Sequence, residues 1–277
     1  MAEDRPQGSP RPPRSTNPIG ALCARNGALA AALVALAVAA CGHKQQVATA
    51  GGTLCGEGLE PFGEVCLALP GGANSETPVV LYLHGMFPSD FPQQSLQAQR
   101  ELAQMAAARG FALLIPRGRL GLCDWKREFL SWYCWPSTAR TAPMAAEIAA
   151  TWAPLWKALD EKLGAASGDK GRRRFLLGYS NGGFFASLLA ARGDVPFDAF
   201  GIAHAGPVEP SWFDPTRPVP VLLLSAEADA WQAPLMEELH ARLFEAGWPH
   251  EYRIRPGGHS LTAGDIEDAL GFFAARK

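Results

Sequence analysis

The chain has 277 residues, of which 48% are hydrophobic and 19% charged, enough to bury a sizeable core. Its formal net charge is −2 at pH 7. This argues against the clustered basic surface that nucleic-acid binding requires, and we expect no nucleic-acid partner. The only dense basic run is residues 172–174, directly before a predicted strand, and we interpret it as a solvated strand start rather than a binding patch.

The N-terminal region differs in composition from the rest of the chain. Residues 1–26 are rich in Pro, Ser and Arg, and a run of about fourteen small apolar residues then ends at Cys41. This run is shorter than the roughly 20 residues of a membrane span and fits the core of a signal peptide. Residues 38–41 (VAAC) resemble the lipobox of bacterial lipoproteins, whose cysteine is lipidated and becomes the first residue of the mature chain.

The lipobox resemblance implies a lipoprotein signal peptide over residues 1–41 that ends at the lipidated Cys41. It also implies a lipid anchor in a membrane and a location in the bacterial cell envelope. An ordinary secretory signal cleaved nearby, or a poor anchor helix, is the alternative.

Four cysteines follow Cys41, namely Cys55, Cys66, Cys123 and Cys134. Within the first two and within the last two the spacing is eleven positions, and each pair brackets a loop or hairpin. Local pairing, Cys55 with Cys66 and Cys123 with Cys134, is the simplest of the three possible connectivities. Such bridges persist in an oxidising compartment. A zinc site is disfavoured because there is no Cys-x-x-Cys spacing and no histidine in either loop, so we expect no metal.

After a linker over residues 42–52, residues 53–277 are predicted to form one domain of alternating strands and helices. Apolar runs bounded by turn residues predict strands at 64–70, 79–85, 111–116, 174–180, 197–206, 219–225 and 251–256. Helices are predicted between them at 93–109, 141–163, 181–192, 234–246 and 263–276, the second split or kinked by Pro154. This alternation predicts an α/β fold with a mostly parallel central sheet and helices on both faces.

Ser180 lies between Gly178 and Gly182 in a G-x-S-x-G pattern. The pattern alone is weak, since a serine in a glycine-rich turn also produces it. Here, however, a strand precedes it and a helix follows at once, which is the order that projects a serine hydroxyl above a sheet. We therefore interpret Ser180 as a nucleophile.

A serine hydroxyl needs a base to take its proton. His259, which follows the last predicted strand in a segment with two glycines, is the candidate that we favour. His204 ends the strand after the nucleophile helix and is the rival base. His84 ends a strand and is interpreted as a structural turn residue.

The base in turn needs a carboxylate that orients it. Asp229 is favoured because it follows a buried strand, and the carboxyl ends of parallel strands face the site. Glu227 and Asp214 are lesser alternatives, and Asp229 could instead cap the helix that follows it.

The order Ser180, Asp229, His259, with LHG at residues 83–85 and GYSNGG at residues 178–183, resembles the α/β-hydrolase superfamily. The chain is most similar to compact carboxylesterases of the dienelactone hydrolase, phospholipase/carboxylesterase and polyhydroxybutyrate-depolymerase or feruloyl-esterase kind. The resemblance implies an oxyanion hole made by the backbone N–H groups of Met86 and Asn181, whose side chains it leaves unconstrained. It also implies that no metal or organic cofactor is needed.

The sequence departs from the smallest members of that superfamily in one segment. No long helical insertion follows the sixth strand, so we expect no large lid domain, but residues 117–140 form an aromatic-rich excursion that includes Cys123 and Cys134. Its aromatic side chains could contact an acyl group or form a small local core under the disulfide. The candidate pocket residues are Phe87, Trp125, Trp132, Tyr179 and Trp231.

The sequence therefore predicts an exported, lipid-anchored serine hydrolase that cleaves small-molecule or polymeric carboxylic esters through an acyl-enzyme intermediate. A peptidase on the same triad is the first alternative. A non-catalytic surface binding protein on the same fold is the second.

Overall fold

The computed structural model describes residues 55–90, 92–164, 171–193, 195–208, 213–214 and 216–276. The predicted signal peptide with Cys41 and the predicted linker over residues 42–52 lie outside these residues. Residues Ala50–Lys277 form one compact unit. Within the residues described, no helix is both long and apolar enough to cross a bilayer.

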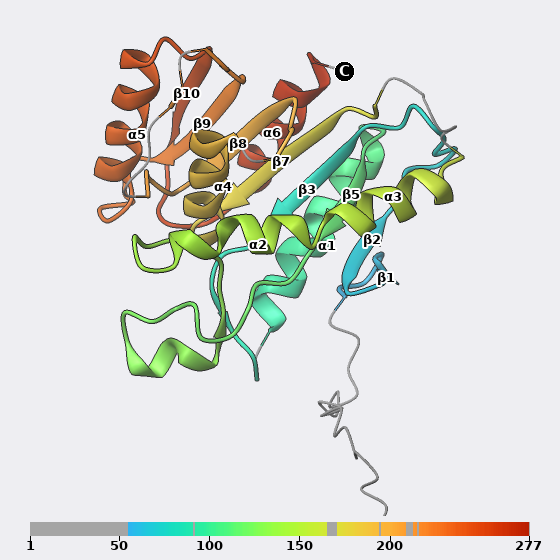
Figure 1. Ribbon diagram of the computed structural model, residues 1–277, viewed down its shortest axis with the longest axis horizontal. Coiled ribbons are helices and arrows are strands. Elements are labelled where there is room, and N and C mark those ends of the chain that lie inside the picture. The colour runs from blue at the N-terminus through green and yellow to red at the C-terminus, as the bar shows by residue number, and fades with distance from the viewer. Residues whose placement is uncertain are drawn as a thin grey trace, which may run out of the picture. The chain divides into compact units, whose positions relative to one another are not determined.

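A mixed, mostly parallel sheet of eight strands runs through this unit (Figure 1). In spatial order the strands are β1 (Glu60–Phe62), β2 (Val65–Ala68), β5 (Ala112–Ile115), β3 (Val79–Leu83), β7 (Arg174–Tyr179), β8 (Ala199–Ala203), β9 (Val221–Ala226) and β10 (His250–Arg255). The β1–β2 and β2–β5 pairs are antiparallel, and every pair from β5 to β10 is parallel. The mostly parallel sheet predicted from the sequence is thus confirmed.

Helices cover both faces of the sheet (Figure 1). They are α1 (Gln93–Ala108), α2 (Ala145–Ala150), α3 (Ala153–Lys162), α4 (Asn181–Arg192), α5 (Ala233–Glu245) and α6 (Ala263–Ala274). Apolar side chains of α2, α3, α4 and α5 pack in one core cluster, and those of α1 and α6 pack in another. The sheet therefore separates two cores.

The central strand β3 shows how the sequence produces this division. Side chains alternate between the two faces of a strand. Val79, Leu81 and Leu83 lie in the core with α4, whereas Val80 and Tyr82 lie in the core with α1 and α6. Both faces are buried, which is why the strand reads as a continuous apolar run rather than an alternating one.

The predicted helix over residues 141–163 is divided, as Pro154 implied. A 3₁₀ turn over Ala142–Met144 leads into α2, and α3 begins after Thr151 and Trp152 with Pro154 in its first turn. A proline is tolerated there because the first N–H groups of a helix have no intrahelical partner. The three-residue strand β1 was not predicted. Pro61 and its exposed neighbours give it no apolar pattern.

Both predicted disulfides are present, Cys55–Cys66 and Cys123–Cys134. The first ties the segment before β1 to β2. The second closes the excursion, where β6 (Trp132–Tyr133) pairs with β4 (Phe87–Pro88), just after β3. This two-stranded ribbon brings the excursion to the carboxyl end of the main sheet.

The interpretation of residues 172–174 as a solvated strand start is wrong for Arg172. Its side chain is only 1% exposed and pairs with Asp160 at 3.0 Å. Its guanidinium also donates to the backbone carbonyls of Asn74 and Thr77. Arg172 thus joins α3 to the turn before β3, and only Arg173 (43% exposed) resembles the solvated charge that was expected.

Candidate active site

Ser180 occupies the turn between β7 and α4 with φ 52° and ψ −119°. A positive φ is rare for a residue with a side chain and costs conformational energy. The turn is held by two backbone hydrogen bonds, from Ser180 N to the Ala203 carbonyl (2.9 Å) and from Phe184 N to the Ser180 carbonyl (3.0 Å). The strand, strained turn and helix have the form expected for a nucleophile elbow.

The glycines of the elbow are required by close packing. A Cβ on Gly178 would overlap the carbonyl oxygen of Gly182, and a Cβ on Gly182 would overlap the carbonyl oxygen of Leu83. Glycine at these positions allows the start of α4 to lie against the ends of β3 and β7. That approach brings Ser180 up to the segment that follows β3.

The structure brings Ser180, His259 and Asp229 into one hydrogen-bonded chain. Ser180 Oγ lies 2.8 Å from His259 Nε2, and His259 Nδ1 donates to Asp229 Oδ2 over 2.7 Å. Asp229 follows β9, and His259 lies between β10 and α6. Tyr179 stacks on the His259 ring with ring centroids 5.5 Å apart and donates from its hydroxyl to the His259 carbonyl.

Asp229 is an acceptor on both carboxylate oxygens. Oδ2 accepts from His259 and from His204 Nδ1 (3.2 Å), and Oδ1 accepts from the Gln232 N–H (3.2 Å). Burial alone would raise the pKa of Asp229, but the hydrogen bonds and charge interaction from these groups more than offset it and hold the pKa below its ordinary value. Asp229 is therefore ionised at neutral pH.

His204, the rival base, does not contact Ser180 through a hydrogen bond. It is 2% exposed, and its Nδ1 binds the same oxygen of Asp229 as His259 does. The alternative acids are not part of this chain either. Asp214 is bonded to Thr216 instead.

The turn after β3 lies directly against Ser180, since a Cβ on Gly85 would be 3.3 Å from the Ser180 Cβ. His84 fixes this turn, with Nδ1–H donating to the Gly85 carbonyl (2.7 Å) and Nε2 accepting from the Gly118 N–H (2.9 Å). Burial lowers the pKa of His84 to about 4, so the ring is neutral and structural, as interpreted from the sequence. Within the described part of the chain, neither the Met86 N–H nor the Asn181 N–H donates a hydrogen bond to the backbone, and the donors of an oxyanion hole must be free in this way.

The side chain of Asn181 is more constrained than the sequence implied. It is 4% exposed, accepts from the Trp135 N–H at 2.7 Å and donates to Ser137 Oγ at 2.7 Å. Trp135 in turn donates from its indole N–H to the His84 carbonyl (3.1 Å) and stacks on Phe185. Asn181 thus joins the end of the excursion to helix α4, which begins directly after Ser180. A polar residue at the start of the apolar helix α4 was the available signal.

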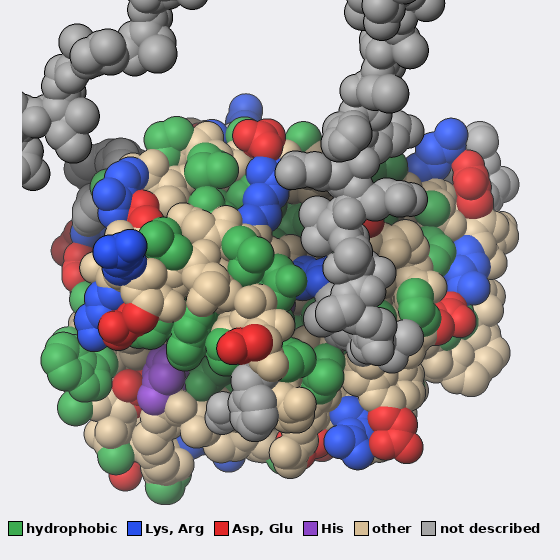
Figure 2. Space-filling model, turned by 90° about the horizontal axis from the view of Figure 1, so that it is seen from below, with side chains coloured by type: hydrophobic (Ala, Val, Ile, Leu, Met, Phe, Trp, Pro, Cys, Tyr) green, Lys and Arg blue, Asp and Glu red, His purple; other side chains and the backbone are tan. Residues whose placement is uncertain are grey.

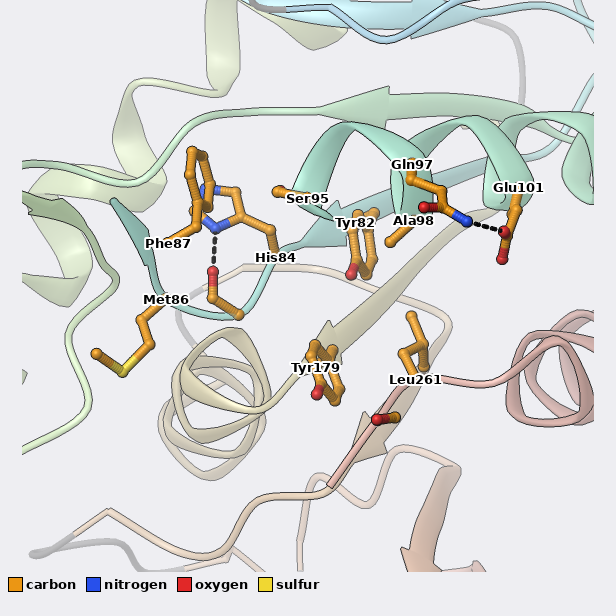
Figure 3. Close-up of a pocket in the computed structure, with 12 residues that line it drawn as sticks. Tyr82, His84, Met86, Phe87, Ser95, Gln97, Ala98, Glu101, Tyr179 and Leu261 are labelled. Atoms are coloured by element: carbon orange, nitrogen blue, oxygen red, sulfur yellow. Dashed lines mark hydrogen bonds between the residues drawn. The ribbon is translucent and has the colours of Figure 1, made fainter. Parts of the chain in front are cut away.

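A pocket of about 300 Å³ opens beside this site (Figure 3). Its walls come from the end of β3 and the following turn, from α1, from Tyr179 and from Ser260 and Leu261 next to His259. Figure 3 shows Met86 and Phe87 on the segment after β3, and Gln97 and Glu101 on α1, joined by a hydrogen bond of 3.2 Å. The pocket therefore combines apolar and polar walls.

Two of the five candidate pocket residues, Phe87 and Tyr179, line this pocket. Trp125, Trp132 and Trp231 are not among its lining residues. Trp125 and Trp132 both pack edge-to-face on Phe129, which agrees with a small local core in the excursion. Trp231, which follows Asp229 by two positions, is 86% exposed. Figure 2 shows hydrophobic side chains next to a histidine at the surface of the face seen from below.

One group among the described residues has the side chains and spacing to ligate a metal ion. Ligand atoms of His204, Asp229 and His259 lie within 4.8 Å of one another. In the structure, however, both imidazoles donate to the same oxygen of Asp229. The hydrogen bonds of the triad thus use the atoms that a cation would need.

No protein-family model and no curated protein matches the chain. Solved structures do match it. Esterase PE8 superposes with a TM-score of 0.56 and 19% identity, covering 79% of this chain and 99% of that one. A carboxylesterase from Mesorhizobium loti superposes with a TM-score of 0.56 and 20% identity, and the covered shares of the two chains are the same. The Bacillus cereus carboxylesterase superposes with a TM-score of 0.55 and 18% identity, covering 78% of this chain and 96% of that one. At these identities the likeness shows the fold, which is the α/β-hydrolase fold.

Proposed function

We propose that this α/β-hydrolase-fold protein is a serine hydrolase of carboxylic esters. The observation that carries the proposal is the unbroken hydrogen-bonded chain from Ser180 Oγ through His259 to the buried Asp229, with the serine on a strained elbow. The solved structures that it resembles include proteins described as esterases and carboxylesterases, which supports an ester as the substrate.

In the proposed reaction, His259 Nε2 takes the proton of Ser180 as Oγ attacks the acyl carbonyl carbon. Asp229 orients the ring and stabilises the imidazolium that forms. The backbone N–H groups of Met86 and Asn181 hold the oxyanion, an interaction worth about 2.7–4 kcal/mol per donor. His259 then gives its proton to the departing alkoxide, and a water molecule activated by His259 releases the acid from Ser180.

The pocket favours a neutral ester. Glu101 is the one charged side chain among the described residues that line it, and His84 is neutral there. A carboxylate on the substrate would meet Glu101 without a compensating Lys or Arg. We therefore expect kcat/KM to be higher for a short-chain neutral ester than for the monoester of a dicarboxylic acid. Glu101→Gln should reduce the ratio of these two kcat/KM values.

The test combines activity with covalent labelling. Ser180→Ala should abolish hydrolysis of a short-chain p-nitrophenyl ester and labelling by a fluorophosphonate probe. Ser260→Ala, next to His259 on the pocket wall, is the matched control and should keep labelling. Unchanged hydrolysis by Ser180→Ala would refute the proposal. Cleavage of aminoacyl-arylamides in preference to esters would replace it with the peptidase alternative, and absence of labelling in the wild type would favour a binding protein.

We further propose that the protein is exported and anchored by lipid at Cys41. The two disulfides support an oxidising compartment. Metabolic labelling with an alkyne fatty acid should mark the wild type and not Cys41→Ser. Equal labelling of both would refute the anchor without affecting the proposed chemistry.

A further inference from the structure

Tyr82 carries the one polar group among the side chains of the central strand β3. The residue is only 2% exposed, and its side chain lies on the face of the sheet that packs against α1 and α6. A buried tyrosine hydroxyl usually has a hydrogen-bond partner, because an unpaired polar group in the core costs free energy. The surroundings of this hydroxyl therefore decide whether Tyr82 only packs in the core or also binds a ligand.

In the part of the chain that the structure describes, no group forms a hydrogen bond with the Tyr82 hydroxyl. The side chain is not sealed in the core, however, because Tyr82 lines the pocket of about 300 Å³ beside the triad. Figure 3 shows its ring between α1 and Tyr179, with the hydroxyl on the side of Tyr179. The hydroxyl of a nearly buried side chain is thus left to a ligand in the pocket.

This hydroxyl is a permanent donor. Burial raises the pKa of the Tyr82 phenol above its ordinary value, so the phenol keeps its proton at neutral pH. The other phenol of the pocket is already engaged, since Tyr179 donates to the His259 carbonyl at 3.1 Å. Of the two phenols that line the described pocket, Tyr82 is therefore the one whose O–H can bind a substrate.

The other walls of the pocket limit what this donor can meet. Ser95 Oγ already accepts from another side chain of α1 (3.2 Å), and Gln97 donates to Glu101 at 3.2 Å. No Lys or Arg is among the described residues that line the pocket, so a substrate carboxylate would have no compensating charge there. An uncharged oxygen on a mainly apolar chain fits this environment. The apolar lining residues are Met86, Phe87, Ala98 and Leu261.

We propose that Tyr82 is a specificity-determining residue, whose hydroxyl donates to an uncharged ether, hydroxyl or carbonyl oxygen in the acyl or alcohol part of the ester. The inference rests on the proposed function and narrows its substrate from a neutral ester to an oxygenated neutral ester. A hydrocarbon chain in the same position would displace water from the Tyr82 hydroxyl and leave it unpaired. Sites that contain such a donor discriminate against analogues without the matching group.

The test compares p-nitrophenyl hexanoate with analogues in which one methylene at a time is replaced by an ether oxygen. Tyr82→Phe should lower kcat/KM for at least one analogue by about 2- to 10-fold, the effect of one neutral hydrogen bond. It should leave kcat/KM for the hexanoate unchanged or higher, because the unpaired hydroxyl is gone. Each ester is compared between two proteins, so differences in intrinsic reactivity cancel. Tyr252→Phe, which removes a hydroxyl on the other side of the sheet, is the matched control and should affect all the esters alike.

A second set of esters carries the ether oxygen in the alcohol part, as analogues of hexyl butyrate whose hydrolysis is followed by acid release. A selective loss in Tyr82→Phe within one set supports the proposal and assigns the oxygen to that part of the substrate. Equal effects of Tyr82→Phe on every parent ester and every analogue would overturn it.

A binding measurement keeps this inference separate from the proposed function. Ketones in which a methylene replaces the ester oxygen cannot be hydrolysed, and calorimetry measures their affinities directly. The ketone with the best-placed ether oxygen should bind the wild type more tightly than its hydrocarbon parent, and Tyr82→Phe should remove that difference. Equal affinities of the two ketones for the wild type would overturn the role of Tyr82. Failure of the proposed ester hydrolysis would appear instead as turnover that survives Ser180→Ala, with the ketone affinities unaffected.

Discussion

Removal of the Asn181 side chain tests whether its hydrogen bonds to Trp135 and Ser137 hold the excursion against helix α4. In Asn181→Ala the buried Trp135 N–H loses its acceptor, 2.7 Å away in the wild type, and Ser137 loses a donor. An unsatisfied buried donor costs about 1–3 kcal/mol. For a domain of this size each kcal/mol lowers Tm by roughly 2–4 °C, so we expect a decrease of roughly 2–12 °C.

The assay is thermal unfolding followed by circular dichroism, under conditions that keep the disulfides oxidised. Ser137→Ala is the matched control, since it removes one partner of Asn181 and leaves the Trp135 bond intact. We expect it to cost about 0.5–1.5 kcal/mol. In the double variant the two losses should not add, with a coupling of about 0.5 kcal/mol or more. An Asn181→Ala protein with the Tm of the wild type would refute the proposed link between Asn181 and the excursion. Strictly additive losses of unfolding free energy in the double variant would refute it as well.

Three further predictions concern other parts of the molecule. Arg172→Met leaves two carbonyls without their donor and leaves the partly exposed Asp160 carboxylate with Arg174 as its remaining partner, and it should destabilise the fold by about 1–3 kcal/mol. Arg173→Met, at a pair that is 43% and 34% exposed, should cost less than about 1 kcal/mol, and chemical denaturation compares the two variants. Replacement of both Cys123 and Cys134 by Ser should cost about 3 kcal/mol, the value for a closed loop of this length, and a variant as stable as the oxidised wild type would contradict it. Asp229→Asn should lower kcat about 10⁴-fold. The folded-state pKa of Asp229 lies below its ordinary value of 3.8. The ionised carboxylate therefore stabilises the fold above pH 3.8, and this contribution is lost as the pH falls through the folded-state pKa. The free energy of unfolding of Asp229→Asn should consequently depend less steeply on pH below pH 3.8 than that of the wild type.

Local sequence signals were sufficient for the parts of the fold that depend on neighbouring residues. The strand before Ser180 is an apolar run buried on both faces, and the helix that follows begins and ends where the pattern placed it, at Asn181 and Arg192. The relative placement of Ser180, Asp229 and His259 required one more rule, that carboxyl ends of parallel strands meet at one edge of the sheet. That rule selected Asp229 before any distance was known, whereas His259 was favoured because it follows the last predicted strand in a segment with two glycines.

The contacts that local signals could not supply all join residues far apart in the chain. Arg172 looked like a solvated charge because nothing near it in sequence indicates the carbonyls at Asn74 and Thr77. His204 and Asn181 likewise receive their partners from other elements. His204 is a single polar residue in an otherwise apolar segment, and Asn181 begins the apolar helix α4. A buried polar group must find a hydrogen bond. That requirement predicts a partner for each of them, but not its identity.

The same contacts give the aromatic excursion a role that differs from that of a lid. The indole of Trp135 binds the carbonyl of His84, and the ring of His84 binds the backbone at Gly118 and Gly85. The turn that carries Met86 is therefore fixed by the excursion on one side and by the nucleophile helix on the other. Donors of an oxyanion hole stabilise charge only when they are oriented before the reaction begins. In the proposed reaction, the buried, neutral His84 and the buried Trp135 would provide that rigidity without placing a charge beside the oxyanion.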